Sequence, residues 1–85
     1  MPMPIPDPAQ TAAATLRLVL DEHPTPLTVE EIRARIAHPD GDPETERQAV
    51  DEAVRDLIAH GVAHRTAGLV LASQAARYTA RLLAR

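Results

Sequence analysis

Apolar residues recur along much of the chain at intervals of three and four residues, which is the spacing of short helices. The clearest example lies between residues 43 and 60, where apolar residues recur at Val50, Ala53, Val54, Leu57 and Ile58. Side chains at these intervals share one face of an α-helix, which turns once in about 3.6 residues. We therefore predict an amphipathic helix here, capped by Asp42, with Pro43 at its first position and Gly61 after its end.

A first helix is predicted over residues 8–21. Asp7 precedes it as a cap, Pro8 suits its first position, and Gln10 is spaced to complete a capping box. The residues expected to face the core are Leu16, Val19 and Leu20. Residues 1–6 alternate with proline, which cannot continue a helix, so we expect a disordered, extended arm before this helix.

The second helix has the strongest local signal in the chain. Thr28 and Glu31 form a T-x-x-E capping box, and Leu27 and Ile32 occupy the hydrophobic staple positions on either side. A capping box satisfies backbone N–H groups that a helix start would otherwise leave unpaired. We therefore expect this helix to follow a short extended piece and to cover about residues 29–37.

A β-hairpin is predicted after the third helix. Two short runs that suit strands, residues 62–65 and 69–72, flank a loop of three residues, Thr66 to Gly68. We expect His64 to be partly buried in the first strand. Ser73 then caps a last helix. The residues of this helix expected to face the core are Ala75, Tyr78 and Leu82.

The order of these elements resembles that of the winged-helix family. The residues that carry the resemblance are Leu27-Thr28-Val29-Glu30-Glu31-Ile32, the helix end Asp56-Leu57-Ile58-Ala59-His60-Gly61, and the hairpin runs Val62–Arg65 and Leu69–Leu71. The chain is particularly similar to small winged-helix proteins of high-GC actinobacteria. The resemblance implies one mainly α-helical winged helix-turn-helix domain over residues 7–85, with a three-helix core, a two-stranded wing and an extra C-terminal helix.

Length and composition narrow the class of protein. The 85 residues suffice for one domain, and none of them is cysteine. The longest apolar runs are far shorter than the roughly 20 residues that span a bilayer, so we expect a cytoplasmic protein without a membrane partner. The net charge of −3 is unevenly spread, since all twelve acidic residues lie in residues 1–56 and residues 57–85 hold only arginines among their charged groups.

Winged-helix proteins commonly place the third helix in the major groove of DNA, so double-stranded DNA is a candidate partner. Arginine can pair with guanine and glutamine with adenine. The candidates for base reading are Arg47, Gln48 and Arg55. Phosphate contacts need positive charge and hydrogen-bond donors. The candidates for phosphate contact are Arg65, Thr66, Arg77, Arg81 and Arg85.

The third helix also has an acidic face, formed by Glu44, Asp51 and Glu52. These carboxylates would repel phosphate, and the sequence pI of about 5.7 is far below the values above 9 that are typical of DNA-binding domains. We therefore expect weak or partner-assisted DNA binding, with a role in transcription regulation. The alternative hypothesis is a non-enzymatic protein-interaction module, in which the acidic third helix meets a basic partner.

Further apolar positions on the first and last helices predict a homodimer. The residues expected to contact a partner are Ala14, Leu18, Ala76 and Leu83. Helices that are apolar over a wide arc usually bury a second face, although single exposed leucines are common on protein surfaces.

Catalysis and metal binding have little support. The one serine is explained as a helix cap, and the chain has neither an HExxH motif nor a glycine-rich phosphate loop. His38, Asp40 and Asp42 could offer metal ligands, but the segment between His38 and Pro43 is also an ordinary turn sequence. We therefore expect no enzyme, no cofactor and no metal site.

Overall fold

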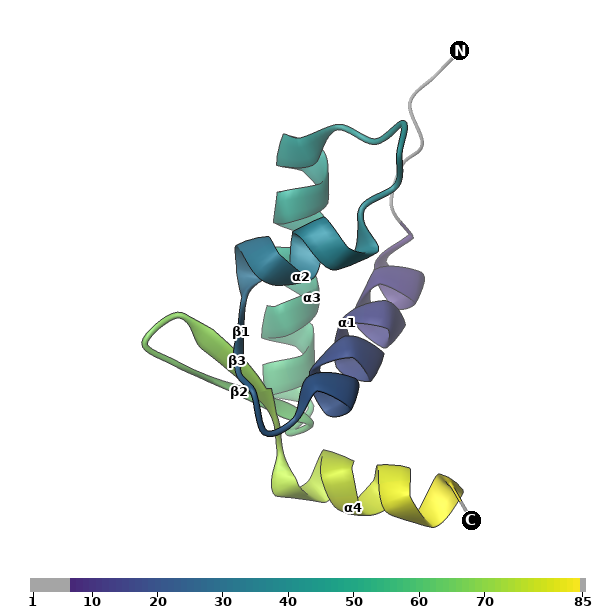
Figure 1. Cartoon of the computed structure of the whole chain (residues 1–85), viewed down its shortest axis with the longest axis vertical. Coiled ribbons are helices and arrows are strands. Elements are labelled where there is room, and N and C mark those ends of the chain that lie inside the picture. Colours follow the sequence, from purple (N-terminus) through teal and green to yellow (C-terminus); the bar gives the residue numbers. More distant parts are fainter. Residues whose placement is uncertain (1–6, 85) are drawn as a thin grey trace.

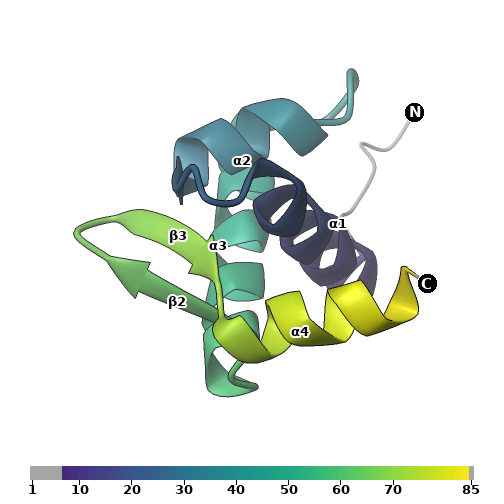
Figure 2. The same ribbon diagram turned by 60° about the horizontal axis from the view of Figure 1, so that its bottom comes forward.

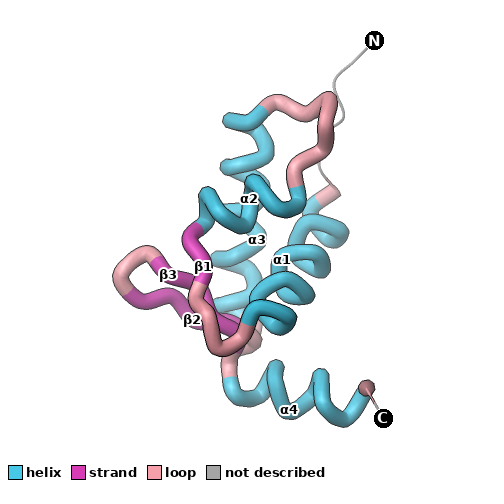
Figure 3. Tube along the Cα trace, in the orientation of Figure 1, coloured by secondary structure: helices cyan, strands magenta, loops and turns pink. Residues whose placement is uncertain are grey.

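In the computed structural model, which describes residues 7–84, helices pack together with one small antiparallel sheet at their side (Figures 1 and 3). The helices of this range are α1 (Pro8–Glu22), α2 (Val29–Ile36), α3 (Pro43–Ala59) and α4 (Gln74–Leu83). The strands are β1 (Leu27–Thr28), β2 (Ala63–Thr66) and β3 (Leu69–Ala72). The prediction of a mainly α-helical fold with a hairpin is confirmed. The expected arm at residues 1–6 and the candidate Arg85 lie outside the described residues.

The helices begin where the sequence predicted caps. In α2 the Thr28 hydroxyl accepts a hydrogen bond from the Glu31 amide at 3.1 Å, and the Glu31 carboxylate accepts one from the Thr28 amide at 3.1 Å. The Asp42 carboxylate accepts from the Thr45 amide at the start of α3, and Ser73 caps α4 in the same way. These local bonds explain why the helix starts could be located from the sequence.

The cap of α1 differs from the prediction. Asp7 Oδ1 accepts a hydrogen bond from the Ala9 amide at 2.9 Å. Within residues 7–84 no hydrogen bond joins Gln10 to the Asp7 side chain, so the expected capping box does not form. Gln10 instead lines a hollow between α1, α2 and α3. A single cap bond is sufficient to start this helix, because proline occupies its first position.

The hairpin belongs to a three-stranded sheet with β3 in the centre. Leu27 pairs with Val70 and Thr28 with Leu69, so the extended piece before α2 forms the third strand. The sequence predicted only the two hairpin strands, because a two-residue strand has no detectable periodicity. His64 lies on the edge strand β2 and is exposed, contrary to the prediction that it is partly buried.

The hairpin turn is also shorter than predicted. Thr66 pairs with Leu69, which leaves Ala67 and Gly68 as the whole turn. Their φ angles are +52° and +78°, as a two-residue type I′ turn requires. Two-residue turns of this type follow the right-handed twist of the strands, whereas a three-residue loop needs an additional bulge. The turn of the hairpin is therefore one residue shorter than the sequence suggested.

The core lies where α1, α2, α3 and the sheet meet. Its largest fully buried side chains are Ile32, Val19, Val50, Val54 and Val70, with Thr15 among them. The apolar face predicted for α3 is confirmed at four positions, whereas Ile58 is exposed at the end of the helix. Leu16, Leu18 and Leu20 are partly buried against this core, so α1 uses a broader face than predicted.

α4 has the opposite orientation from the one predicted. Ala75, Tyr78 and Leu82 were expected to face the core, but all three are exposed. Ala76 is buried and belongs to the core cluster. Figure 2 shows that α4 lies across the end of the molecule, next to α1, and leaves much of its circumference uncovered. α4 is amphipathic, with Arg77 and Arg81 on one side, but its apolar residues cover a wide arc, so their spacing does not identify which part of that arc is buried.

Candidate nucleic-acid interface

An open hollow lies between α3, the start of α2 and the hairpin. Its lining includes the three candidates for base reading and one candidate for phosphate contact: Arg47, Gln48, Arg55 and Arg65. The acidic candidates line the same surface: Glu44, Asp51 and Glu52. We call this surface the α3–hairpin hollow. The structure thus brings together residues that the sequence assigned to two competing functions.

Each arginine of the α3–hairpin hollow lies beside a carboxylate. Arg47 Nη2 is 2.6 Å from Glu44 Oε1, one turn earlier on α3. Arg55 Nη2 is 2.7 Å from Asp51 Oδ2. Arg65 Nη1, on β2, is 3.4 Å from the other carboxylate oxygen of Asp51. Asp51 therefore links α3 to the hairpin and holds two of the arginines.

Two of the ion pairs along this side of the molecule shift the pKa of a member in the direction that favours its charged form. The hydrogen bonds that Arg47 donates to the Glu44 carboxylate raise the pKa of Arg47 above its usual value. At the edge of the hollow, the hydrogen bond from the Arg33 guanidinium lowers the pKa of Glu30. Both shifts favour the ionised forms of Arg47 and Glu30.

The charges of the hollow do not favour a polyanion. Its carboxylates are Glu30, Glu44, Asp51 and Glu52, and its guanidinium groups are Arg47, Arg55 and Arg65. The lining therefore carries a net charge of −1. Exposed ion pairs contribute little to stability, so an arginine can exchange its carboxylate for a phosphate. The carboxylate then remains in place and repels the same phosphate, which weakens binding.

The other candidates for phosphate contact lie elsewhere. Arg77 and Arg81 line a separate hollow beside the end of α1, together with Asp21 and His23. α4 runs away from the hairpin (Figures 1 and 2), and the two hollows share no lining residue. Thr66 is exposed in β2 without lining either hollow. The predicted phosphate contacts therefore do not form one continuous surface with the base-reading residues.

The predicted dimer contacts do not form a surface either. Ala76 is only 6% exposed and packs in the core, so it cannot touch a partner unless α4 leaves its place. Leu18 is partly buried against the same core. Ala14 is half-buried, and Leu83 is largely exposed at the end of α4. The sequence could not separate these positions, because alanine and leucine fit both a core and an interface.

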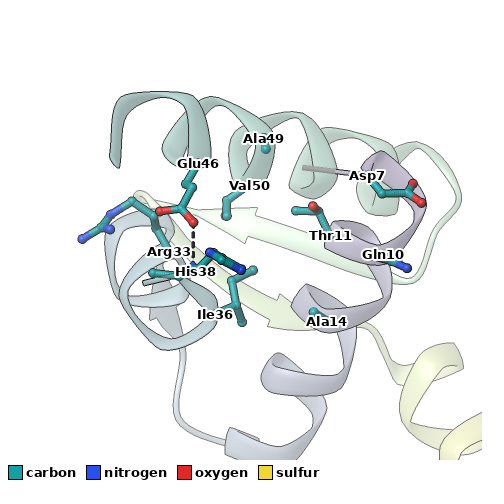
Figure 4. Close-up of a pocket in the computed structure, with 11 residues that line it drawn as sticks. Asp7, Gln10, Thr11, Ala14, Arg33, Ile36, His38, Glu46, Ala49 and Val50 are labelled. Atoms are coloured by element: carbon teal, nitrogen blue, oxygen red, sulfur yellow. Dashed lines mark hydrogen bonds between the residues drawn. The ribbon is translucent and has the colours of Figure 1, made fainter. Parts of the chain in front are cut away.

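A further hollow of about 330 Å³ lies between α1, the end of α2 and α3 (Figure 4). Its apolar lining residues are Ala14, Ile36, Ala37, Ala49 and Val50. Glu46 extends from α3 and accepts a hydrogen bond from the His38 amide at 2.7 Å, drawn as a dashed line in Figure 4. The same carboxylate lies over Gly41, where a Cβ would approach Glu46 Oε2 to 2.5 Å. Glu46 thus holds the turn between α2 and α3 in place.

The residues considered for metal binding serve this same turn. His38 Nδ1 accepts a hydrogen bond from the Asp40 amide at 3.2 Å, and Asp42 caps α3. Between residues 7 and 84, no group of three histidine or acidic side chains lies close enough to hold a metal ion. The helices of this range are also too short or too polar to cross a membrane.

Comparisons with known proteins identify no relative. The chain matches no family model, no curated protein and no solved structure. The resemblance to the winged-helix family therefore stays a prediction, and the function must be inferred from the residues of the chain itself.

Proposed function

We propose that the chain is a winged-helix regulatory protein that binds double-stranded DNA weakly, or with the help of a partner, through the α3–hairpin hollow. The observation that carries this proposal is the convergence of Arg47, Gln48, Arg55 and Arg65 on one open surface. The first three come from one side of α3, and the fourth comes from the adjoining strand. Side chains of this type can contact base edges and phosphates together.

The order of the elements supports the winged-helix interpretation. A helix and a short strand precede two further helices and a hairpin, and the third helix lies beside that hairpin. In this arrangement α3 would enter the major groove and the hairpin would follow the backbone. The two-residue hairpin turn has little reach, and the acidic lining opposes phosphate. Both features are consistent with weak binding.

A titration of a labelled random-sequence duplex at several salt concentrations tests this proposal. If the three arginines each neutralise one phosphate, the slope of log affinity against log salt is about −2 to −3. Arg55→Ala should reduce the affinity and lower the magnitude of this slope by about 1. Arg35→Ala is the matched control, because Arg35 is an exposed arginine of α2 outside the hollow. Absence of binding at low salt would contradict the proposal.

The alternative function is an interaction module that binds a basic protein. It is favoured by one observation, the excess of carboxylates over guanidinium groups in the α3–hairpin hollow. Glu52 distinguishes the two functions, because it is exposed and forms no ion pair within residues 7–84. Glu52→Gln should raise the affinity for DNA severalfold and lower the affinity for a polylysine peptide, since it removes one negative charge.

A further inference from the structure

α4 carries three of the four large apolar side chains that are exposed in the described residues. Tyr78, Leu82 and Leu83 are 57%, 47% and 81% exposed, and Ile58 is the one other large apolar side chain of residues 7–84 that is exposed. Tyr78 and Leu82 are one helical turn apart, so their side chains are neighbours on the same face. We call these three residues the α4 strip. Tyr78 and Leu82 face solvent because α4 uses a different side, centred on Ala76, to contact the core, and Leu83 is exposed because it is the last residue of the helix.

A basic edge borders the α4 strip. Arg77 and Arg81 are also one turn apart, and they line the hollow beside the end of α1. Neither forms an ion pair within residues 7–84, in contrast to every arginine of the α3–hairpin hollow. The Nε atom of Arg77 is buried without a hydrogen-bond partner in the same range. A partner surface that complements this one would place apolar side chains on the α4 strip and anionic groups on the two guanidinium groups.

We propose that α4 is a docking site for an acidic amphipathic helix of another protein. Apolar side chains of that helix would cover Tyr78, Leu82 and Leu83, and its carboxylates would pair with Arg77 and Arg81. Helices recognised in this way present apolar anchors one turn apart, with charged residues on their flanks. The inference concerns a surface separate from the α3–hairpin hollow, and it goes beyond the proposed binding of DNA.

A second copy of the chain fits the α4 strip less well. A dimer through the strip would bring the arginine edges of both copies to one interface, and α4 carries no acidic residue to offset them. The acidic surface of another copy is the α3–hairpin hollow, which contains Glu44, Asp51 and Glu52. No large exposed apolar side chain of the described residues lines this hollow, so it could not cover the α4 strip. The charge of α4 therefore favours a different, acidic partner.

Titration with a synthetic helix of leucine and glutamate tests this inference. The peptide should be about 18 residues long, because isolated helices shorter than roughly 12–15 residues are only marginally stable in water. The peptide contains no tyrosine or tryptophan, so the emission of Tyr78, the one aromatic residue of the chain, reports contact with the strip. We expect saturable binding that changes this emission. Leu82→Asp should weaken binding at least tenfold.

Charge reversal provides the matched control. Arg81→Glu should weaken binding of the glutamate peptide severalfold and should strengthen binding of the same peptide with lysine in place of glutamate. Arg55→Glu changes an exposed arginine of the α3–hairpin hollow, so it should leave peptide binding unchanged. Because DNA binding is tested at Arg55 and peptide binding at Arg81, the two proposals fail independently. Circular dichroism verifies that each variant is folded.

Four outcomes would overturn the inference. The first is absence of peptide binding at high micromolar concentration, and the second is binding that Leu82→Asp does not change. The third is a dimer, detected by sedimentation equilibrium, that Leu82→Asp dissociates, because the strip would then be covered by a second copy. The fourth is DNA binding that Arg81→Glu abolishes while peptide binding is retained, which would assign α4 to nucleic acid.

Discussion

Thr15 lies in the middle of α1 with no exposed surface, and its hydroxyl has no hydrogen-bond partner within residues 7–84. Its neighbours in the core are aliphatic, including Val19 on the next turn of the same helix. A buried hydroxyl without a partner costs roughly 1–3 kcal/mol, because it loses its hydrogen bonds to water. The sequence did not place Thr15 in the core, since a polar residue interrupts the apolar pattern from which buried faces are predicted.

Thr15→Val should raise the free energy of unfolding by about 1 kcal/mol, because valine has nearly the same shape and removes the unpaired hydroxyl. Urea denaturation followed by circular dichroism measures the change. Thr15→Ala is the control, since it removes the hydroxyl together with a packed methyl group and should therefore be less stable than Thr15→Val. Loss of stability in Thr15→Val would show that the hydroxyl has a partner.

Among the elements, the start of α3 depends on a single charged cap. The Asp42 carboxylate accepts hydrogen bonds from the Thr45 hydroxyl at 2.7 Å and from the Thr45 amide at 3.0 Å. The hydrogen bond from the hydroxyl has the larger effect and lowers the pKa of Asp42, and the hydrogen bond from the amide lowers it further. Since this pKa is lower in the folded chain than in the unfolded chain, Asp42 stabilises the fold above its unfolded pKa. That contribution is lost as the pH falls through the folded pKa.

Asp42→Asn should make the free energy of unfolding less dependent on pH in the acidic range. Asparagine remains a good helix cap but has no proton to gain, so the part of the acid sensitivity that arises from Asp42 disappears. Urea denaturation at about pH 7 and about pH 3 measures the difference, because the unfolded pKa of aspartate, near 3.9, lies between them. An equal loss of stability in the variant and the original chain would refute this role of Asp42.

At the scale of the whole molecule, packing divides residues that appear equivalent in the sequence. Ala76 and Leu83 were both expected to contact a dimer partner, and they are seven residues apart on α4. Ala76 is buried against the core, whereas Leu83 projects into solvent. Their different environments arise because only the first turns of α4 lie against α1 and the sheet, while the helix end extends past them (Figure 2).

Ala76→Asp should lower the free energy of unfolding by more than about 2 kcal/mol, because it places an unpaired carboxylate in an apolar core. Leu83→Asp should change it by no more than about 0.5 kcal/mol, as is usual for exposed positions. Thermal or urea denaturation of the two variants measures both values. Similar values for the two variants would mean that α4 does not pack through Ala76.

The candidate interface could be predicted in part. Glu44, Arg47, Asp51 and Arg55 recur at intervals of three and four residues, so the sequence places them on one side of α3 and next to one another. The contact between Arg65 and Asp51 joins residues 14 positions apart, and it depends on how the hairpin lies against α3. The separation of Arg77 and Arg81 from this surface depends in the same way on the direction of α4.

The sequence by itself determined where the helices begin and that a hairpin follows α3, because caps, prolines, glycines and apolar spacing act within a few residues. It also determined the uneven distribution of charge between the two parts of the chain. Only the tertiary structure decided which side of α4 is buried, that Leu27 and Thr28 pair with β3, and that the arginines form two separate groups. These features depend on contacts between distant segments, and an alanine-rich helix fits more than one such arrangement equally well.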